Sequence, residues 1–323
     1  MVRVLAVLTS GGDAPGMNAA IRAIVRSGLQ RGLAVVGVQH GYSGLMNGDY
    51  LDLDAQSVSN IIQRGGTILR TDRAKEFRTP EGRKLAADAM AKRGIDGLIV
   101  IGGNGTLHGA SMLAKEHSIP VIGVPSTIDN DLFGTDWTIG YDTAVNTAIY
   151  NIDKIRDTAE ALERTFYIEV MGRATGFIAL DVGLATGAEY ISIPEREPKL
   201  DVLLKLFERQ RATKRSNIVI VAEGDSTGVG ALELACRVKE VNGMDYRVTI
   251  LGHIQRGGSP TARDRILASK LGAYAVDRIL AGETSIMTGE AAGQLTTTPL
   301  QQAFTRVKPI DHSLVELSAL LSA

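Results

Sequence analysis

Two aspartates separated by one residue are the strongest chemical signal in this 323-residue sequence. Asp129 and Asp131 follow the apolar run Val121–Val124, which predicts a buried strand. If the segment after the strand is extended, both side chains face the same side, because side chains alternate along an extended chain. Close carboxylates repel each other, so the pair suits a general base or a metal ligand. A solvated acidic turn is the alternative interpretation.

Two glycine-rich segments are suited to hold phosphate. Ser10–Gly16 and Gly102–Thr106 each follow an apolar run and precede a helical pattern. Glycine lets the backbone approach a phosphate closely, and the N-terminus of a helix attracts anions. Neither segment has the Gly-Lys-Ser/Thr of a P-loop or the GxGxxG of a dinucleotide site. Each is also compatible with an ordinary strand-to-helix turn.

Three later segments place arginine, glutamate or histidine where strands are expected to end. They are Met171–Arg173, Ala222–Gly224 and Leu251–Gly258. Arginine binds phosphate through a planar set of donors, whereas a lone histidine is more often structural. Glycine loops, paired carboxylates and arginines together predict phosphoryl transfer between two phosphorylated small molecules. These residue types do not name the substrate.

The elements that must position these residues alternate along the whole chain. The expected strands are 2–8, 34–39, 97–101, 121–124, 166–170 and 218–221. The expected helices are 17–31, 80–93, 106–117, 141–157, 200–213 and 262–280. Near-continuous apolar strands alternating with helices predict an α/β fold of two Rossmann-like lobes. We expect mainly parallel sheets covered by helices, with the active site in the cleft between the lobes.

The length exceeds that of a typical single domain of roughly 100–200 residues. Turns at 134–140 and 252–259 are the expected crossings between the lobes. We expect one lobe of 1–140 plus 255–305 and a second lobe of 141–254 plus 306–323. The last long helix should pack back on the first lobe.

Composition excludes several other classes of function. A net charge of −1 gives no general attraction for nucleic acid. No apolar stretch approaches the ~20 residues of a membrane span. Cys236 is the only cysteine, which excludes an intrachain disulfide and a zinc cluster and is typical of a reducing cytoplasm. We expect a cytoplasmic protein with small-molecule ligands and neither nucleic acid nor membrane as partner.

The chain resembles the phosphofructokinase family along essentially its whole length. The motifs Leu8–Asn18, Thr127–Asp131, Met171–Arg173 and Gly252–Gly258 occur in the order and spacing of that family. The resemblance implies the bacterial type of 6-phosphofructokinase, which transfers phosphate from Mg-ATP to the 1-hydroxyl of fructose 6-phosphate in glycolysis. A pyrophosphate-dependent phosphofructokinase and a weakly active regulatory paralogue are the alternatives. A nicotinamide-dependent dehydrogenase has only the parallel-sheet architecture in its favour.

The resemblance also implies that the lobe of 1–140 plus 255–305 binds the phosphoryl donor and that the lobe of 141–254 plus 306–323 binds the sugar phosphate. It implies roles for individual residues as well. Asp129 matches the base that takes the proton of the 1-hydroxyl, with Thr127 and Asp131 as supports. Arg73 and Arg173 complete the implied catalytic set, and Mg²⁺ is expected at Asn104 and Asp131. The donor side is matched by Gly11, Tyr42, Arg73, Arg78, Gly103, Asn104, Gly105 and Thr106. The sugar-phosphate side is matched by Thr127, Asp129, Arg164, Met171, Gly172, Arg173, Glu223, Arg247, His253 and Arg256.

The same resemblance implies a homotetramer with shared active sites. Arg164 and Arg247 match two arginines that the family lends across a subunit interface to the 6-phosphate. A site for a nucleoside diphosphate or phosphoenolpyruvate effector is matched by Arg22, Arg26, Arg156, Glu189 and Lys214. Basic side chains or histidine are usual where this chain has Ala55, Ala212 and Ser216. We therefore expect a weakened effector response.

Three positions bear on the choice of phosphoryl donor. Asn104 stands where users of ATP usually carry an aspartate that helps to hold magnesium. Ser126 matches neither the glycine of ATP users nor the lysine of pyrophosphate users. Pyrophosphate users typically have a carboxylate at the position of Gly105, which would crowd and repel the α-phosphate of a nucleotide. Gly105 therefore favours ATP.

Overall fold

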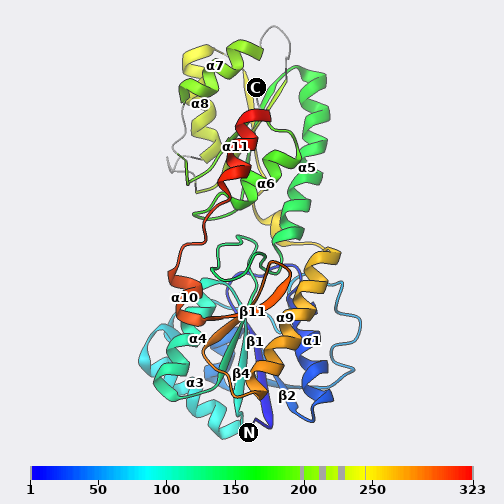
Figure 1. Ribbon diagram of the computed structural model, residues 1–323, viewed down its shortest axis with the longest axis vertical. Helices are drawn as coiled ribbons and strands as arrows, with labels where there is room; N and C mark the ends of the chain where they lie inside the picture. Colours follow the sequence, from blue (N-terminus) through cyan, green and yellow to red (C-terminus); the bar gives the residue numbers. More distant parts are fainter. Residues whose placement is uncertain (1, 197–199, 211–215, 225–229, 244, 322–323) are drawn as a thin grey trace. The chain divides into compact units, whose positions relative to one another are not determined.

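The computed structural model describes residues 2–196, 200–210, 216–224, 230–243 and 245–321. The chain forms two compact units (Figure 1). The first contains Met1–Thr143 and Arg256–Lys308, and the second contains Ala144–Gln255 and Pro309–Ala323. The chain therefore passes between the units three times. The assignment of the first unit to the donor and of the second to the sugar phosphate stays a prediction.

A seven-stranded sheet forms the centre of the first unit in the described part of the chain. Its order is β11–β10–β5–β4–β1–β2–β3. The strands are β1 (Val4–Thr9), β2 (Ala34–Val38), β3 (Tyr50–Leu53), β4 (Gly97–Gly102), β5 (Val121–Pro125), β10 (Ile286–Ala291) and β11 (Gln294–Pro299). The five strands from β10 to β2 are parallel, and the two edge strands are antiparallel to their neighbours.

The register of this sheet brings three loops to one edge. Thr9 of β1 is paired with Ile101 of β4, and Gly102 of β4 with Pro125 of β5. The carboxyl ends of these three strands therefore lie side by side. Ligands of parallel sheets bind at such an edge, because the helices that follow begin there.

Helices cover both faces of this sheet (Figure 1). One face carries α1 (Met17–Gln30) and α9 (Ala262–Leu280), which pack against each other. The other carries α3 (Pro80–Arg93), α4 (Asn104–His117) and α10 (Leu300–Thr305), whose buried side chains form a core with β1, β4 and β5. The short helices α2 (Gly41–Asn47) and η1 (Glu76–Arg78) lie next to α3. The expectation that the last long helix packs on the first lobe is confirmed.

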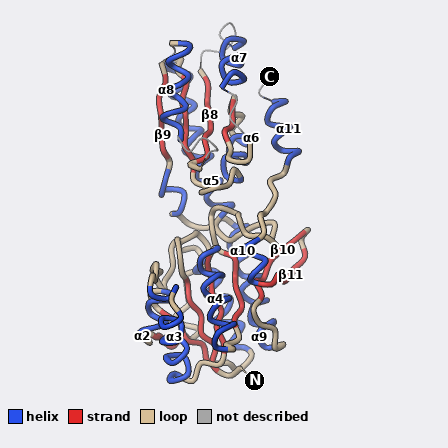
Figure 2. The backbone as a smooth tube through the Cα atoms, turned by 90° about the vertical axis from the view of Figure 1, so that its left-hand side faces the viewer, coloured by secondary structure: helices blue, strands red, loops and turns tan. Residues whose placement is uncertain are grey.

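The second unit has a parallel sheet of order β7–β8–β6–β9 in its described residues. The strands are β6 (Thr165–Val170), β7 (Tyr190–Ser192), β8 (Asn217–Ala222) and β9 (Tyr246–Ile250). The helices are α5 (Tyr141–Leu162), α6 (Phe177–Ala185), α7 (Leu200–Gln210), α8 (Gly230–Asn242) and α11 (His312–Leu321), with the 3₁₀ helix η2 (Gly252–Arg256) after β9. Figure 2 shows the strands of this unit flanked by α6 and α8. None of the described helices is long and apolar enough to span a bilayer.

The predicted α/β architecture is confirmed, and several bounds differ. The helix expected at 106–117 begins at Asn104, and the helix expected at 141–157 continues to Leu162. Residues 211–213, expected to end a helix, lie outside the described residues. The pattern analysis missed β3, β7, β9, β10 and β11. Their side chains are more exposed or more polar than those of the central strands, so their apolar signal is weak.

Candidate active site

The loop after β1 is held against the loop after β4. Thr106 lies in the first turn of α4, and its hydroxyl donates to the carbonyl of Ser10 at 2.9 Å. Gly11 has a φ of +86°, in the left-handed region that glycine adopts at little cost. A Cβ on Gly102 would lie 2.4 Å from Oγ1 of Thr106, so that position also requires glycine. The two predicted phosphate loops are therefore neighbours.

The second loop exposes the N-terminus of α4. Gly103 is the N-cap residue, and no side chain caps this end of the helix with a hydrogen bond in the described structure. Gly105 is exposed, and no described atom lies within 4 Å of where its Cβ would stand. Backbone N–H groups in the first turn of a helix attract anions. The loop is thus built to receive phosphate oxygens.

The loop after β5 carries the carboxylates. Asp129 is 2% exposed, and its N–H donates to the hydroxyl of Thr127 at 3.2 Å. Asn130 has a φ of +53°, so the segment turns between the two aspartates. The segment is therefore not extended, and the alternation of side chains does not place both carboxylates on one side. Asn and Asp adopt this conformation more readily than other non-glycine residues, because their short side chains form local hydrogen bonds.

A hydrogen bond joins the donor loop to the carboxylate loop. Nδ2 of Asn104 donates to Oδ2 of Asp131 at 2.5 Å. Asn104 is the first residue of α4, so it does not act as the N-cap of that helix. Its amide instead binds one of the two residues that the resemblance assigns to the metal.

An aromatic pair lies beside the donor loop. The ring of Tyr42, on α2, stacks on Phe77 of η1 with centroids 3.9 Å apart and an interplanar angle of 9°. The Tyr42 hydroxyl donates to the carbonyl of Thr106 at 2.6 Å. Burial raises the pKa of Tyr42 far above its usual value, so the hydroxyl stays protonated and keeps this hydrogen bond. The pattern analysis missed Phe77, which is the one apolar residue among the polar residues of 75–79.

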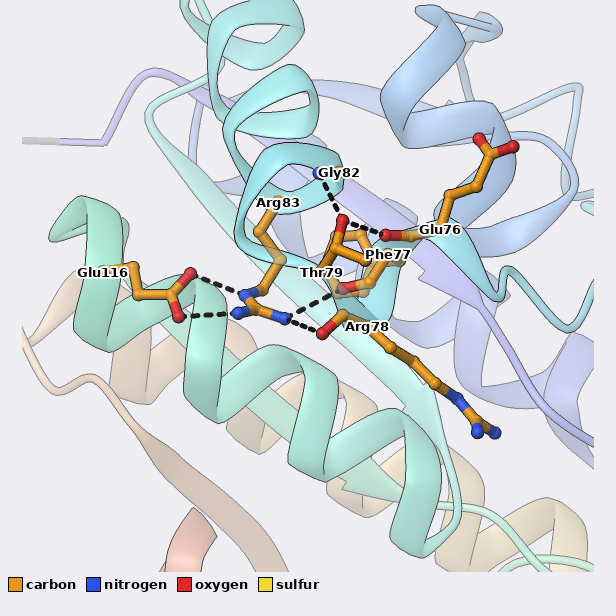
Figure 3. A network of polar contacts seen from close by, with 7 residues as sticks. All are labelled: Glu76, Phe77, Arg78, Thr79, Gly82, Arg83 and Glu116. Atoms are coloured by element: carbon orange, nitrogen blue, oxygen red, sulfur yellow. Dashed lines mark hydrogen bonds and ion pairs between the residues drawn. The ribbon is translucent and has the colours of Figure 1, made fainter.

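A buried arginine fixes the backbone of η1, as Figure 3 shows. Arg83 of α3 forms a bidentate ion pair with Glu116 of α4, with N···O distances of 2.6 and 2.7 Å. Nη1 of Arg83 also donates to the carbonyls of Phe77 and Arg78, at 3.1 and 2.8 Å. The hydrogen bond from Arg83 lowers the pKa of Glu116, so the pair stays ionised at neutral pH. The backbone that carries Arg78 is thus rigid, while its exposed side chain can reach a ligand.

Arg73 is exposed in the loop that precedes η1. Its N–H donates to Oδ1 of Asp72 at 2.6 Å, and Oδ2 of the same carboxylate accepts from Ser43 at 2.6 Å. These hydrogen bonds, that of Ser43 first, lower the pKa of Asp72. The backbone at Arg73 is therefore tied to α2, and its guanidinium extends toward solvent.

Arg256 contacts the first glycine loop. Its Nη1 donates to the carbonyl of Asp13 at 3.2 Å. A Cβ on Gly12 would lie 2.5 Å from the same nitrogen, so Gly12 makes room for this guanidinium. The first unit thus contains Arg256 together with the predicted donor residues and the carboxylate loop.

In the second unit, predicted sugar-phosphate residues gather at the carboxyl ends of β6 and β8. Gly172 has a φ of +143° and Arg173 a φ of +53°. The N–H of Arg173 donates to Oε1 of Glu223 at 2.8 Å. A Cβ on Gly224 would lie 1.8 Å from the carbonyl of Arg173, so the two loops are in close contact. The N–H of Met171 donates to Oε1 of Gln255, two residues after the exposed His253.

Two predicted substrate residues lie at the opposite end of that sheet. Arg164 directly precedes β6, and Arg247 of β9 is paired with Phe166 near the beginning of β6. Lys239 and then these two arginines lower the pKa of Asp245, which places a positive cluster at this end. Within one chain, the structure therefore separates Arg164 and Arg247 from Met171, Gly172, Arg173 and Glu223.

Comparisons with known proteins agree with the motifs. The family model of phosphofructokinase matches residues 4–279. The chain belongs to the phosphofructokinase family. ATP-dependent 6-phosphofructokinase 1 of Thermus thermophilus is 54% identical over 319 residues, which cover 98% of this chain and 99% of that protein. ATP-dependent 6-phosphofructokinase 2 of Bacteroides thetaiotaomicron is 53% identical over 323 residues, covering 99% of each.

A solved phosphofructokinase structure has the same fold. Phosphofructokinase from Saccharomyces cerevisiae superposes with a TM-score of 0.88 at 36% identity. The match covers 99% of this chain and 46% of the yeast chain. The α/β fold predicted from the sequence is therefore confirmed as the fold of a solved phosphofructokinase.

The carboxylates of the loop after β5 are of a kind that suits a divalent cation. Asp129 and Asp131 lie two residues apart, and the Oδ1 atoms of both are buried. Hard cations such as Mg²⁺ bind to one or two carboxylates and to substrate phosphates. In the described residues, no group of three or more His, Cys, Asp or Glu is placed to hold a metal by itself. The carboxylate loop fits a cation that is held jointly with a phosphorylated ligand.

Two residues matched to the effector site make contacts within this chain. Arg156 donates to the carbonyls of Thr186 and Gly187. Glu189 is 4% exposed, and its Oε2 accepts from the N–H of Ile218 at 2.5 Å. Arg22 and Arg26 lie on α1, whereas Lys214 and Ala212 lie outside the described residues. The buried carboxylate of Glu189 has a structural partner that an effector would have to replace.

Proposed function

We propose that this chain transfers the γ-phosphoryl group of ATP to the 1-hydroxyl of fructose 6-phosphate, giving fructose 1,6-bisphosphate. The hydrogen bond between Asn104 and Asp131 is the observation that carries the proposal. It joins the N-terminus of α4, which suits phosphate, to the loop that contains Asp129. A phosphoryl donor and an acceptor hydroxyl bound at these two loops would be adjacent, and alignment is most of what phosphoryl transfer requires.

Each implied group has a chemical role in this reaction. Asp129 accepts the proton of the 1-hydroxyl as the sugar oxygen attacks phosphorus. The N–H groups of the first turn of α4 and the guanidinium of Arg73 offset charge on the transferred group. Asn104 and Asp131 would hold Mg²⁺, which supplies charge neutralisation to the donor phosphates when bound. Arg173, Glu223 and His253 bind the sugar phosphate.

ATP is the proposed donor rather than pyrophosphate. Gly105 leaves open space at the start of α4, where a carboxylate would repel the α-phosphate of a nucleotide. Relatives more than 50% identical are named ATP-dependent, which supports the same choice. The stacked rings of Tyr42 and Phe77 are buried and support the donor loop, since the Tyr42 hydroxyl donates to the carbonyl of Thr106.

Arg164 and Arg247 are proposed to act in a neighbouring subunit of a homotetramer. They lie at the end of β6 opposite Arg173, so a single chain cannot use both sets on one sugar phosphate bound at Arg173.

The substrates of this reaction are cytoplasmic metabolites, and we place the enzyme in the cytoplasm.

The decisive assay compares ATP and pyrophosphate as donors to fructose 6-phosphate, with and without Mg²⁺. We expect turnover with ATP that requires the metal, and little with pyrophosphate. Turnover with pyrophosphate alone would overturn the choice of donor, and none with either donor would favour a regulatory paralogue.

The role of Asp129 is tested by Asp129→Ser. Loss of a general base costs about 10²-fold or more in turnover. We expect that loss with fructose 6-phosphate binding largely retained in an equilibrium titration. Near-normal turnover in this variant would show that Asp129 is not the base.

A further inference from the structure

The loop that carries Asp129 is clamped by a segment that the sequence motifs did not single out. Residues 135–139 return beside this loop after a turn. The N–H of Ile139 donates to the carbonyl of Pro125 at 3.0 Å, and Ser126 forms a parallel bridge with Ile139. The N–H of Asp136 donates to the carbonyl of Glu290 on β10 at 2.8 Å. The returning segment is therefore fixed to the sheet and can serve as a rigid support.

Two side chains link this support to the loop. Oδ1 of Asn130 accepts from the N–H of Thr138 at 3.0 Å, and Nδ2 of Asn130 donates to the carbonyl of Asp136 at 3.2 Å. The hydroxyl of Thr138 donates to the carbonyl of Thr127 at 2.6 Å. Asn130 is 5% exposed and Thr138 is fully buried. Asp129 thus lies between two anchored positions of the chain, Thr127 and Asn130.

Asparagine at position 130 provides hydrogen bonds that the left-handed backbone conformation by itself does not require. Glycine, asparagine and aspartate adopt a φ of +53° more readily than most other residues. Glycine would provide neither hydrogen bond. Aspartate would accept from Thr138, but it would place a third negative charge between Asp129 and Asp131 and could not donate to Asp136. Only asparagine combines the conformation, the acceptor and the donor without adding charge.

We propose that Asn130 and Thr138 are positioning residues that hold the Asp129 carboxylate in line with the acceptor hydroxyl. The inference rests on the proposed function, in which Asp129 is the general base. Neither side chain is proposed to touch a substrate. Their contribution is geometric, because a base misplaced by about 1 Å can cost on the order of 10²-fold in rate.

Matched substitutions at Thr138 separate positioning from stability. Thr138→Val keeps the shape of the side chain and removes the hydroxyl, whereas Thr138→Ser keeps the hydroxyl. Thr288→Val is the control, because Thr288 is also fully buried in the first unit and its hydroxyl donates to a backbone carbonyl, that of Gly123. Asn130→Gly keeps the left-handed backbone and removes both hydrogen bonds, so it provides a second test if Thr138→Val folds poorly.

Turnover, Michaelis constants and thermal unfolding are measured for each variant. We expect Thr138→Val and Asn130→Gly to lower kcat by about 10- to 100-fold, with little change in KM for either substrate. Thr138→Ser should recover most of the lost turnover. Thr288→Val should lower the unfolding temperature to a similar extent and leave kcat unchanged. Equal kcat values for Thr138→Val and Thr288→Val would overturn the inference.

A double substitution distinguishes this inference from the proposed function. In an Asp129→Ser background, Thr138→Val should cause no further loss, because it acts through the removed carboxylate. An additional loss equal to that in the wild type would show that Thr138 acts independently of Asp129. If Asp129→Ser itself retains normal turnover, the proposed base is wrong. If Asp129→Ser is inactive and Thr138→Val is unimpaired, only the positioning inference fails.

Discussion

Replacing Asn104 by aspartate would change the charge of the proposed metal site by one unit without changing its shape. In the structure, the Asn104 amide donates to Asp131 at 2.5 Å. Aspartate at position 104 cannot donate, so the substitution exchanges a hydrogen bond for two adjacent carboxylates. A hydrogen bond to a charged group contributes about 1.5–3 kcal/mol. The metal-free variant should therefore be less stable than the wild type.

The size of the repulsion follows from the separation of the two groups. Unit charges about 4 Å apart repel by roughly 1 kcal/mol in water and by about 4 kcal/mol at an effective dielectric constant of 20. Both side chains are half-buried, which places the value between these limits. A bound Mg²⁺ ion relieves the repulsion, so the same free energy should appear as tighter metal binding. Because about 1.4 kcal/mol corresponds to a tenfold change, the Mg²⁺ requirement should fall by at least about five-fold.

The assay is a titration of free Mg²⁺ at fixed ATP, together with thermal unfolding at the same metal concentrations. Asn104→Asp should shift the rate curve to lower Mg²⁺ and leave the fructose 6-phosphate requirement little changed. Its unfolding temperature should be lower than that of the wild type without metal and should recover as Mg²⁺ is added. Asn104→Ala is the control, since it removes the hydrogen bond and adds no charge. Superimposable Mg²⁺ curves for the wild type and Asn104→Asp would refute the assignment of Asn104 to the metal site.

Three further predictions concern assembly, regulation and pH. Mixing inactive Arg164→Ala chains with inactive Asp129→Ser chains should restore activity in hybrid oligomers. If hybrid oligomers form without any recovery of activity, each active site is built from one chain. ADP and phosphoenolpyruvate should barely shift the fructose 6-phosphate saturation curve, and strong shifts at micromolar effector would show a working effector site. Burial raises the pKa of Asp264 to about 6, so the folded protein binds more protons and this group lowers stability as pH rises from about 4 to 6. Asp264→Asn should remove about 2 kcal/mol of the loss in unfolding free energy between pH 4 and pH 7, measured by urea unfolding at those two pH values.

The order of the strongest elements could be predicted from the sequence because their signal is local. Continuous apolar runs identified β1, β4, β5, β6 and β8, and the helices predicted over 80–93 and 262–280 have the bounds of α3 and α9. Glycines and charged residues directly after these runs led to the prediction of where ligands bind. These inferences need only the pattern of neighbouring residues, since the carboxyl ends of parallel strands share one edge.

Other features depend on contacts between residues distant in the sequence. The left-handed turn at Asn130 is stabilised by Thr138 and Asp136, which the residues 127–131 alone do not reveal. The ion pair of Arg83 with Glu116 joins two helices, and nothing in the pattern of either helix indicates it. The edge strands are rich in polar residues, so their composition does not predict a strand. They form strands because they pair with a neighbouring strand of the sheet.

The sequence by itself determined that Asn104 and Asp131 each follow an apolar strand and could both contribute to a phosphate or metal site. It did not determine that the two side chains meet. The tertiary structure decided this, because the register that pairs Gly102 with Pro125 brings the ends of β4 and β5 together. The amide of Asn104 then lies within hydrogen-bonding distance of a carboxylate 27 residues away. A hydrogen bond of this kind depends on the relative position of two strands, which the local sequence around either residue does not specify.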